Sequence, residues 1–224
     1  MAIAASVLLN RAAKTLLDET GVLWSSAELL DYINAAISAV VTIKPDTYVL
    51  TSTFTLTNAQ AKQTLPSGGL QLVEVTRNLS PGSSVIRQVE RNHLNHTDED
   101  WAATAGTPKH FMYDRRNPKN FYIYPQPASG TNTVELVYSA VPTRLTTAAD
   151  LLPIDDIYEN PLFFYVVAMA YAKNAKRGDN VKMNGYMSMF MTSMGIRKNV
   201  QDMFGPVTPI ENPQGAGMKQ GPTE

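Results

Sequence analysis

The stretch from Lys109 to Tyr138 constrains the fold most strongly, because strand and turn signals alternate within it. Apolar and aromatic residues recur there with a period of two, the pattern of half-buried strands. The three runs are 111–113, 121–124 and 134–138. Proline, glycine and polar residues at 114–119 and 128–130 predict chain reversals between them. We therefore predict three consecutive antiparallel strands, a meander, whose aromatic face is covered by helices from the two ends of the chain.

Two amphipathic helices are predicted before this stretch. Residues 3–19 carry apolar side chains at helical spacing, and Gly21 is expected to close that helix. Ser25 stands three residues before Glu28, the spacing of a capping box, and predicts the start of a second helix that Pro45 ends. The short link between them predicts a helical hairpin.

Two further helices are predicted near the C-terminus. The first is apolar around most of its circumference, which indicates burial on more than one side. Pro161 is compatible only with a first helical turn, so we expect this helix to begin at Asn160. The second is predicted over 181–194, with Gly195 as a left-handed cap.

The predicted fold class is α+β, with a helix bundle and a mostly antiparallel β domain of about six strands. Additional strands are expected at 47–57, 70–78 and 85–89. The bundle is assigned to residues 1–45 and 153–197, and the β-rich domain to 46–152. Residues 198–224 are rich in proline and glycine and poor in apolar anchors, so we expect a flexible C-terminal arm.

Composition excludes several classes of function. The 224 residues carry a net charge of −1, so no overall field draws the chain to nucleic acid or to an acidic membrane. The absence of cysteine excludes disulfides and thiolate metal sites. No stretch approaches about 20 apolar residues, so no membrane contact is predicted.

The few candidates for chemistry have simpler explanations. His93 and His96, beside the acidic residues 98–100, have metal-ligand character but lack a third ligand at a suitable spacing. The pair Asp155 and Asp156 suits a helix N-terminus better than acid–base catalysis. No Gly-x-Ser-x-Gly elbow occurs. We predict that the chain is not an enzyme, with no catalytic residue, no cofactor and no metal, while a metal hydrolase built on the two histidines stays as a distant alternative.

A small basic patch is the main candidate for nucleic-acid contact. Arg115, Arg116 and Lys119 lie close to Tyr122 and Tyr124, and basic residues with aromatics are a weak signature of nucleic-acid binding. Three interpretations remain open. The patch makes this a small nucleic-acid-binding module, or its charges are simply solvated at a hairpin tip, or they contact a neighbouring subunit or the DNA in the channel.

Candidate partner contacts lie in the last helix and in the arm. A methionine stripe on that helix is either ordinary core or an adaptable contact surface, because thioether side chains repack easily. The arm is either dispensable or orders on a neighbour. The candidate contacts are Met183, Met187, Met191, Met194, Phe204, Pro206 and Ile210.

Five segments in order resemble the adaptor, or head-to-tail connector, proteins of tailed bacteriophages. They are WSSAELLDYINAAISAVVTIKPD, LPSGGLQLVEVTRN, VIRQVERNHL, FYIYPQP followed by VELVYSAVP, and LPIDDIYENPLFFYVVAMAYAKNA. The resemblance covers about Val22 to Met194. It departs from the family pattern at Pro161, where a helix-continuing residue is expected.

The resemblance implies a virion structural protein at the head–tail junction, assembled in the host cytoplasm. Such a protein forms a ring of twelve copies, joins the portal protein to tail or nozzle proteins, and contacts passing double-stranded DNA only transiently. A ring needs a heterologous interface, in which one patch meets a different patch on the next copy. The resemblance carries over no catalytic residue.

Overall fold

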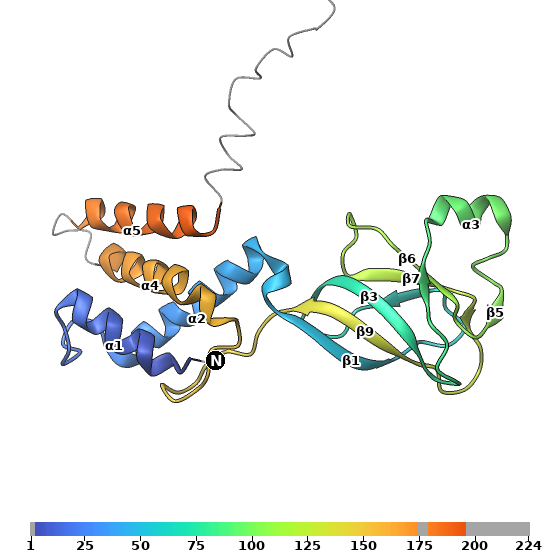
Figure 1. Cartoon of the computed structure of the whole chain (residues 1–224), viewed down its shortest axis with the longest axis horizontal. Helices are drawn as coiled ribbons and strands as arrows, with labels where there is room; N and C mark the ends of the chain where they lie inside the picture. The colour runs from blue at the N-terminus through green and yellow to red at the C-terminus, as the bar shows by residue number, and fades with distance from the viewer. Residues whose placement is uncertain (1–2, 174–178, 196–224) are drawn as a thin grey trace, which may run out of the picture.

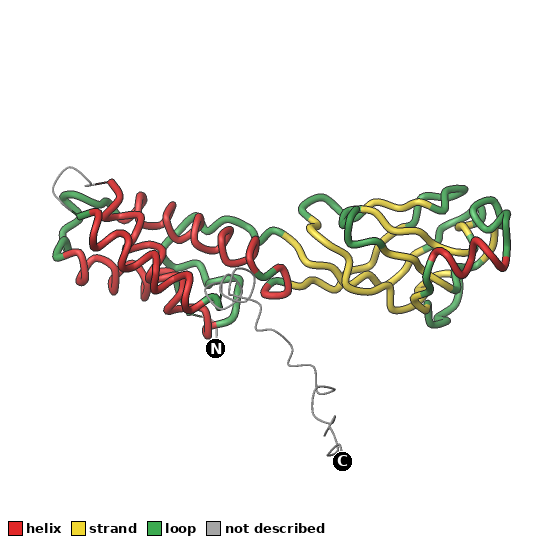
Figure 2. Tube along the Cα trace, turned by 90° about the horizontal axis from the view of Figure 1, so that it is seen from above, coloured by secondary structure: helices red, strands yellow, loops and turns green. Residues whose placement is uncertain are grey.

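A computed structural model describes residues 3–173 and 179–195. The molecule is elongated, with helices gathered at one end and strands at the other (Figure 1). Figure 2 shows the same separation from above. Two chain segments cross between the ends side by side, and the Ala140 N–H donates to the Tyr48 carbonyl at 3.1 Å. The predicted α+β class is confirmed.

Four helices share one apolar core at the helical end. The most buried side chains of this core include Leu8, Ile33 and Phe190. Helix α4 contacts each of the other three, which explains why it is apolar around most of its circumference. The helices are α1 (Ala5–Leu16), α2 (Ser26–Ile43), α4 (Glu159–Lys173) and α5 (Asn180–Ser193). Helix α4 begins one residue before the predicted start, after a short 3₁₀ turn η2 (Asp156–Tyr158).

The caps of the first two helices were predicted with unequal success. The Ser25 hydroxyl accepts a hydrogen bond from the Glu28 N–H at 3.2 Å, as the capping-box spacing predicts. The prediction that the first helix reaches residue 19 and closes at Gly21 is wrong. The helix ends at Leu16, and its C-cap Leu17 takes the left-handed conformation with φ 56°. The next residue, Asp18, binds backbone N–H groups of the following loop and turns the chain early.

Helix α2 is long and apolar enough to cross a membrane by length and composition alone. Its apolar face is already covered, because Ile33, Ala36 and Val40 are fully buried in the helical core. Helix α4 packs against this face. We therefore interpret α2 as a core helix.

Two sheets pack face to face in the β-rich end. The first has the order β1–β9–β3, with both pairs antiparallel, and the second has the order β2–β7–β6–β4. A separate parallel pair joins β5 and β8. The strands of the first sheet are β1 (Val49–Thr55), β3 (Gly69–Ser80) and β9 (Thr133–Ala140). The others are β2 (Lys62–Thr64), β4 (Arg87–Gln88), β5 (Ala105–Gly106), β6 (His110–Tyr113), β7 (Asn120–Tyr124) and β8 (Gln126–Pro127).

The predicted alternation along β6 and β7 is confirmed. Phe111, Phe121 and Ile123 face the first sheet and share a core with Val134 and Leu136. The alternate side chains form a second cluster on the opposite face, under the short helix α3 (Arg91–Thr97) and the loop after it. Members of that cluster include Leu94, Trp101, Met112, Tyr122 and Tyr124.

The predicted meander is wrong in its third strand. Strands β6 and β7 do pair, but β9 leaves them and pairs with β1 and β3 in the other sheet. The aromatic face is therefore covered by a second sheet and not by the terminal helices. The described residues contain nine strands, three of them only two residues long, where about six were expected.

The connector after β9 packs on the helices. Leu145, Leu152 and Ile154 are buried in the helical core. The Asn34 side chain of α2 donates to the Leu145 carbonyl at 3.0 Å and accepts from the Leu145 N–H at 2.8 Å. The last residues of the range assigned to the β-rich domain thus contact the helix bundle.

Candidate interaction surfaces

The predicted basic patch lies at the tip of the β6–β7 hairpin. Arg115, Arg116 and Lys119 are all exposed there. Asp114 shapes the turn, since its carboxylate accepts the Arg116 N–H at 2.9 Å and its carbonyl accepts the Asn117 N–H at 2.9 Å. The three cations therefore project from a defined turn into solvent.

Helix α3 adds a cation that the sequence analysis did not include. The Arg91 guanidinium lies 5.2 Å from the centre of the Tyr122 ring. Arg91, Arg115 and Arg116 line a hollow of about 730 Å³, together with the acidic side chains of Glu90 and Asp114. The register of β6 against β4 brings α3 beside the hairpin, which no local pattern in the sequence reveals.

The histidines of α3 do not assemble a metal site. His93 and His96 are exposed, and no group of three potential ligands occurs in the part of the chain that the structure describes. Asp98, which the sequence placed near them, instead accepts the Tyr124 hydroxyl at 3.0 Å. That hydrogen bond raises the pKa of Tyr124.

The acidic pair before α4 has a structural role. The Asp155 carboxylate accepts the Ile157 N–H at 3.0 Å and so caps the turn η2. The hydrogen bond with Asp155 is the main cause that lowers the pKa of Asp156. These contacts fit the helix-start interpretation of the pair.

The methionine stripe on α5 divides between core and surface. Met194 is only 2% exposed and belongs to the helical core, and Met187 packs against the core while partly exposed. Met183 is also half-buried. Met191 is 37% exposed, so it is the member most open to a partner. The predicted contacts Phe204, Pro206 and Ile210 lie outside the described residues.

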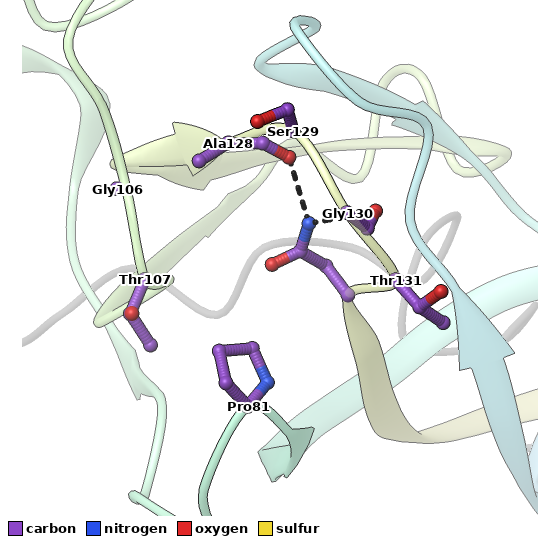
Figure 3. A pocket seen from close by; sticks show the side chains of 8 residues that line it. Pro81, Gly106, Thr107, Ala128, Ser129, Gly130 and Thr131 are labelled. Atoms are coloured by element: carbon purple, nitrogen blue, oxygen red, sulfur yellow. Dashed lines mark hydrogen bonds between the residues drawn. The ribbon is translucent and has the colours of Figure 1, made fainter.

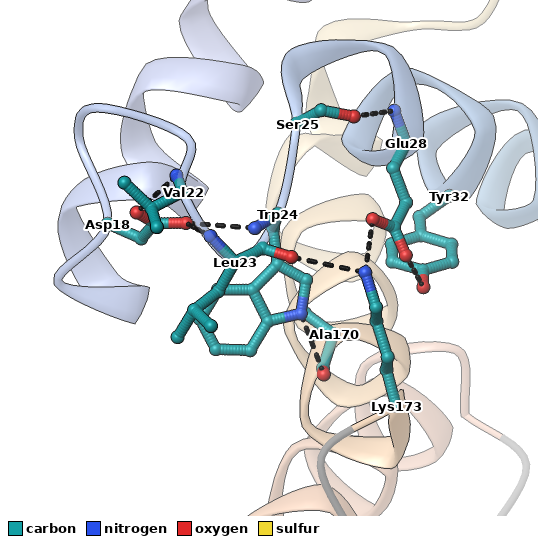
Figure 4. A network of polar contacts seen from close by, with 9 residues as sticks. All are labelled: Asp18, Val22, Leu23, Trp24, Ser25, Glu28, Tyr32, Ala170 and Lys173. Carbon is teal, nitrogen blue, oxygen red and sulfur yellow. Dashed lines mark hydrogen bonds and ion pairs between the residues drawn. The ribbon is translucent and has the colours of Figure 1, made fainter.

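The loop between α1 and α2 lies at the far helical end (Figure 1) and carries three exposed apolar residues. Leu17 is 92% exposed, Val22 81% and Leu23 51%. Buried Asp18 fixes this loop, because its carboxylate accepts the N–H groups of Val22, Leu23 and Trp24 at 2.8, 2.8 and 2.9 Å (Figure 4). The Trp24 N–H is the main cause that lowers the pKa of Asp18. We call Leu17, Val22 and Leu23 the apolar tip.

A polar network ties the loop to α2 and α4. The Trp24 indole donates to the Ala170 carbonyl at 3.0 Å, and Lys173 Nζ reaches the Leu23 carbonyl at 3.1 Å and Glu28 at 2.6 Å (Figure 4). Lys173 is the main cause that lowers the pKa of Glu28. The loop that carries the apolar tip is therefore fixed by hydrogen bonds to α2 and α4. No pattern in the sequence of this loop predicts those contacts.

A second hollow, of about 320 Å³, lies in the β-rich part between residues 81, 106–107 and 128–132 (Figure 3). The Pro81 ring closes one side and residues 128–132 the other. Asn132 holds that loop, since its amide donates to the Ala128 carbonyl at 2.8 Å. None of the lining residues is titratable, so the hollow offers no acid, base or nucleophile with an activated side chain.

Comparison with known proteins then decides the family. The family model for the SU10 adaptor protein matches residues 4–210. This chain belongs to the SU10 adaptor family. No curated protein matches the chain. The SU10 adaptors are a phage head–tail adaptor family, so the resemblance found in the sequence is confirmed.

Because the chain belongs to the SU10 adaptor family, its exposed surfaces are interpreted as candidate contact sites. A structural adaptor of the virion works through contacts with other phage head and tail proteins. The apolar tip, the basic hairpin and the exposed Met191 are candidates for such contacts. They lie on different elements and differ in chemistry.

Proposed function

We propose that this SU10 adaptor forms a ring of twelve copies that joins the portal to the tail and lines part of the DNA channel. The observation that supports it best is a pair of unlike surfaces on different parts of one elongated subunit. The apolar tip lies at the helical end, and the basic hairpin belongs to the β-rich end. Unlike patches on one chain are what a closed head-to-tail ring requires.

The low net charge of the chain supports the proposal that it lines part of the DNA channel. A chain with net charge −1 offers passing DNA few phosphate contacts overall. Many such contacts would bind DNA tightly and slow its passage. The few cations of the hairpin tip allow only brief contact.

The test is the mass of the purified chain with and without portal protein, measured by native mass spectrometry. We expect a monomer alone and a ring with portal. A tight dimer that ignores portal would overturn the proposal.

A matched pair of variants locates the contact. Val22 in the apolar tip is 81% exposed and Val85 in the β-rich part is 66% exposed. We expect Val22→Asp to abolish assembly and Val85→Asp to leave it intact, with unchanged folding in both because neither side chain is buried. Equal assembly by the two variants would exclude the tip as a contact.

We propose in addition that residues 198–224 act as an arm that orders on the portal or on a neighbouring subunit, with Phe204, Pro206 and Ile210 as its contacts. Two apolar residues and a proline within a segment rich in proline and glycine are typical of such arms. Removal of residues 198–224 is expected to weaken portal binding without changing thermal unfolding. Full portal binding by the truncated chain would show that the arm is dispensable.

A second candidate function is nucleic-acid binding by the basic hairpin. The observation that favours it is Arg91, which joins Arg115 and Arg116 around one hollow. Binding to short double-stranded DNA should then fall steeply with salt and disappear in the Arg115→Ala, Arg116→Ala double variant. DNA binding that the double variant retains would exclude the patch.

A further inference from the structure

Three of the four edges of the two larger sheets in the described chain are protected. Strands β2 and β4, the edges of the second sheet, are only three and two residues long. Strand β3 has register shifts along its length, and residues 84–86 lie against it through the bonds Asn78 N–H to Ser84 carbonyl and Ile86 N–H to Thr76 carbonyl. Short edges, bulges and covering segments are the usual means by which proteins prevent edge pairing.

Strand β1 has none of these protections. It is seven residues long, pairs with β9 in a regular register, and has the sequence VLTSTFT, without proline or charge. Within the described residues its only paired neighbour is β9. Figure 1 shows β1 along the lower margin of the β-rich part. It is an exposed template for another strand.

The hydrogen-bond pattern identifies the free backbone groups. The Tyr48 carbonyl accepts from Ala140, and the Leu56 N–H donates to the Asn132 carbonyl, so the even-numbered residues bond to β9. In an antiparallel ladder the alternate residues point the other way. The N–H and carbonyl groups of Val49, Thr51, Thr53 and Thr55 therefore face the open edge.

We propose that the β1 edge binds an extended segment of a phage head or tail protein, which adds a fourth strand to the β1–β9–β3 sheet. The other described sheet edges of a second copy are short or covered, so they do not supply this strand. Pairing of two β1 edges is the alternative that the exchange experiment below tests. Residues 206–222 of the chain contain four prolines, and 196–205 contain three charged residues, so neither suits an uncharged strand of this length. A head–tail adaptor must in any case contact other virion proteins.

The two faces of β1 specify the sequence of the docked segment. Leu50 and Phe54 pack against the core between the sheets, whereas Thr51, Thr53 and Thr55 are exposed. The side chains of the docked strand extend the row of Leu50 and Phe54 on one face of the sheet and the row of threonines on the other. It therefore needs about six residues without proline that alternate apolar and uncharged polar side chains, with the apolar row over the rim of the core.

Amide hydrogen exchange on the isolated chain and on the purified virion tests the inference residue by residue. In the isolated chain we expect fast exchange at Thr51, Thr53 and Thr55 and slow exchange at Leu50 and Phe54. In the virion the three threonine amides should become protected. No added protection in the virion would overturn the proposal, and concentration-dependent protection in the isolated chain would show that copies of the chain pair with each other instead.

A pair of variants at Thr53 tests the same edge by function. Thr53→Pro removes an outward N–H and leaves the bonds to β9, while Thr53→Val keeps that N–H. We expect roughly tenfold weaker incorporation into virions for Thr53→Pro, the effect of one lost hydrogen bond, and wild-type incorporation for Thr53→Val. Equal incorporation by the two variants would overturn the proposal. Ring formation is measured separately by mass, so Thr53→Pro that forms the ring with portal but is poorly incorporated into virions would distinguish failure of the β1 edge from failure of the ring.

Discussion

The Asn34 amide is expected to hold the connector after β9 against the helix bundle. It makes two hydrogen bonds with Leu145, at 2.8 and 3.0 Å, and both residues are almost completely buried. Asn34→Ala leaves the Leu145 N–H and carbonyl without partners. Each unsatisfied buried group costs about 1–3 kcal/mol, so we expect a loss of about 2–6 kcal/mol of unfolding free energy. This is a large part of the stability of an ordinary domain.

Urea denaturation followed by far-ultraviolet circular dichroism measures that loss as a lower midpoint. Asn10→Ala is the matched control, because Asn10 is an exposed asparagine on α1. The control should change stability by no more than about 0.5 kcal/mol. If Asn34→Ala lost no more than Asn10→Ala, the two hydrogen bonds would not be what holds the connector, and the reasoning would fail.

Three further predictions concern polar groups and strain. The Thr147 hydroxyl, with neighbouring N–H groups, lowers the pKa of Asp150 to about 2. The stabilising effect of the ionised Asp150 carboxylate is therefore present above about pH 4 and disappears as the pH falls toward 2. The difference in thermal midpoint between wild type and Asp150→Ala should shrink over that range. Burial and the Glu28 carboxylate raise the pKa of Tyr32 to about 12; NMR titration of the ring should show a lower value in Glu28→Gln, and an unchanged value would refute the assignment. The neutral phenol stabilises the fold below pH 10, and this effect is lost toward pH 12. Leu17→Gly should raise the free energy of unfolding by up to about 1 kcal/mol, measured by thermal unfolding, because glycine adopts the φ of 56° at this position without strain. The same variant should weaken assembly, because it removes the Leu17 side chain from the apolar tip.

The helices could be predicted because their signals are local. Ser25 and Glu28 sit three residues apart, and the cap they predict is present. Pro161 requires its helix to begin no more than a few residues before it, and α4 begins at Glu159. Gly195 has φ 76°, as expected for a left-handed cap. Each of these features depends on the conformation of a few neighbouring residues, which the sequence specifies directly.

The partners of the strands could not be predicted in the same way. A period of two shows which side chains are buried but not which surface covers them. Residues 128–130 look like a hairpin turn, but the chain there passes from one sheet to the other, and β9 pairs with β1 across more than 75 residues of sequence. The expected helical cover was wrong for the same reason. Only the summed packing of both sheets decides between these arrangements.

The polar residues that organise the surfaces were also missed. Asp18, Asn34 and Gln63 are buried although their residue types are usually exposed. Each satisfies backbone groups of an irregular segment, as Gln63 does for the Thr57 N–H and carbonyl at 2.8 and 3.0 Å. Such burial follows from where loops pass in three dimensions. Nothing in the sequence around these residues distinguishes them from solvated ones.

The junction between the two ends sets the direction in which an adaptor subunit presents its surfaces. The crossing segments are joined to each other by the Ala140–Tyr48 bond, and the Val141 N–H donates to the Gly68 carbonyl at 2.9 Å. A side-chain bond between Gln71 and Asp46, at 3.3 Å, is exposed and therefore contributes little. Main-chain bonds thus hold three segments together at the crossing, and none of these bonds uses a side-chain atom. In the proposed ring, surface charge changes near Asp46 should alter local contacts but not the angle between the helical and β-rich ends.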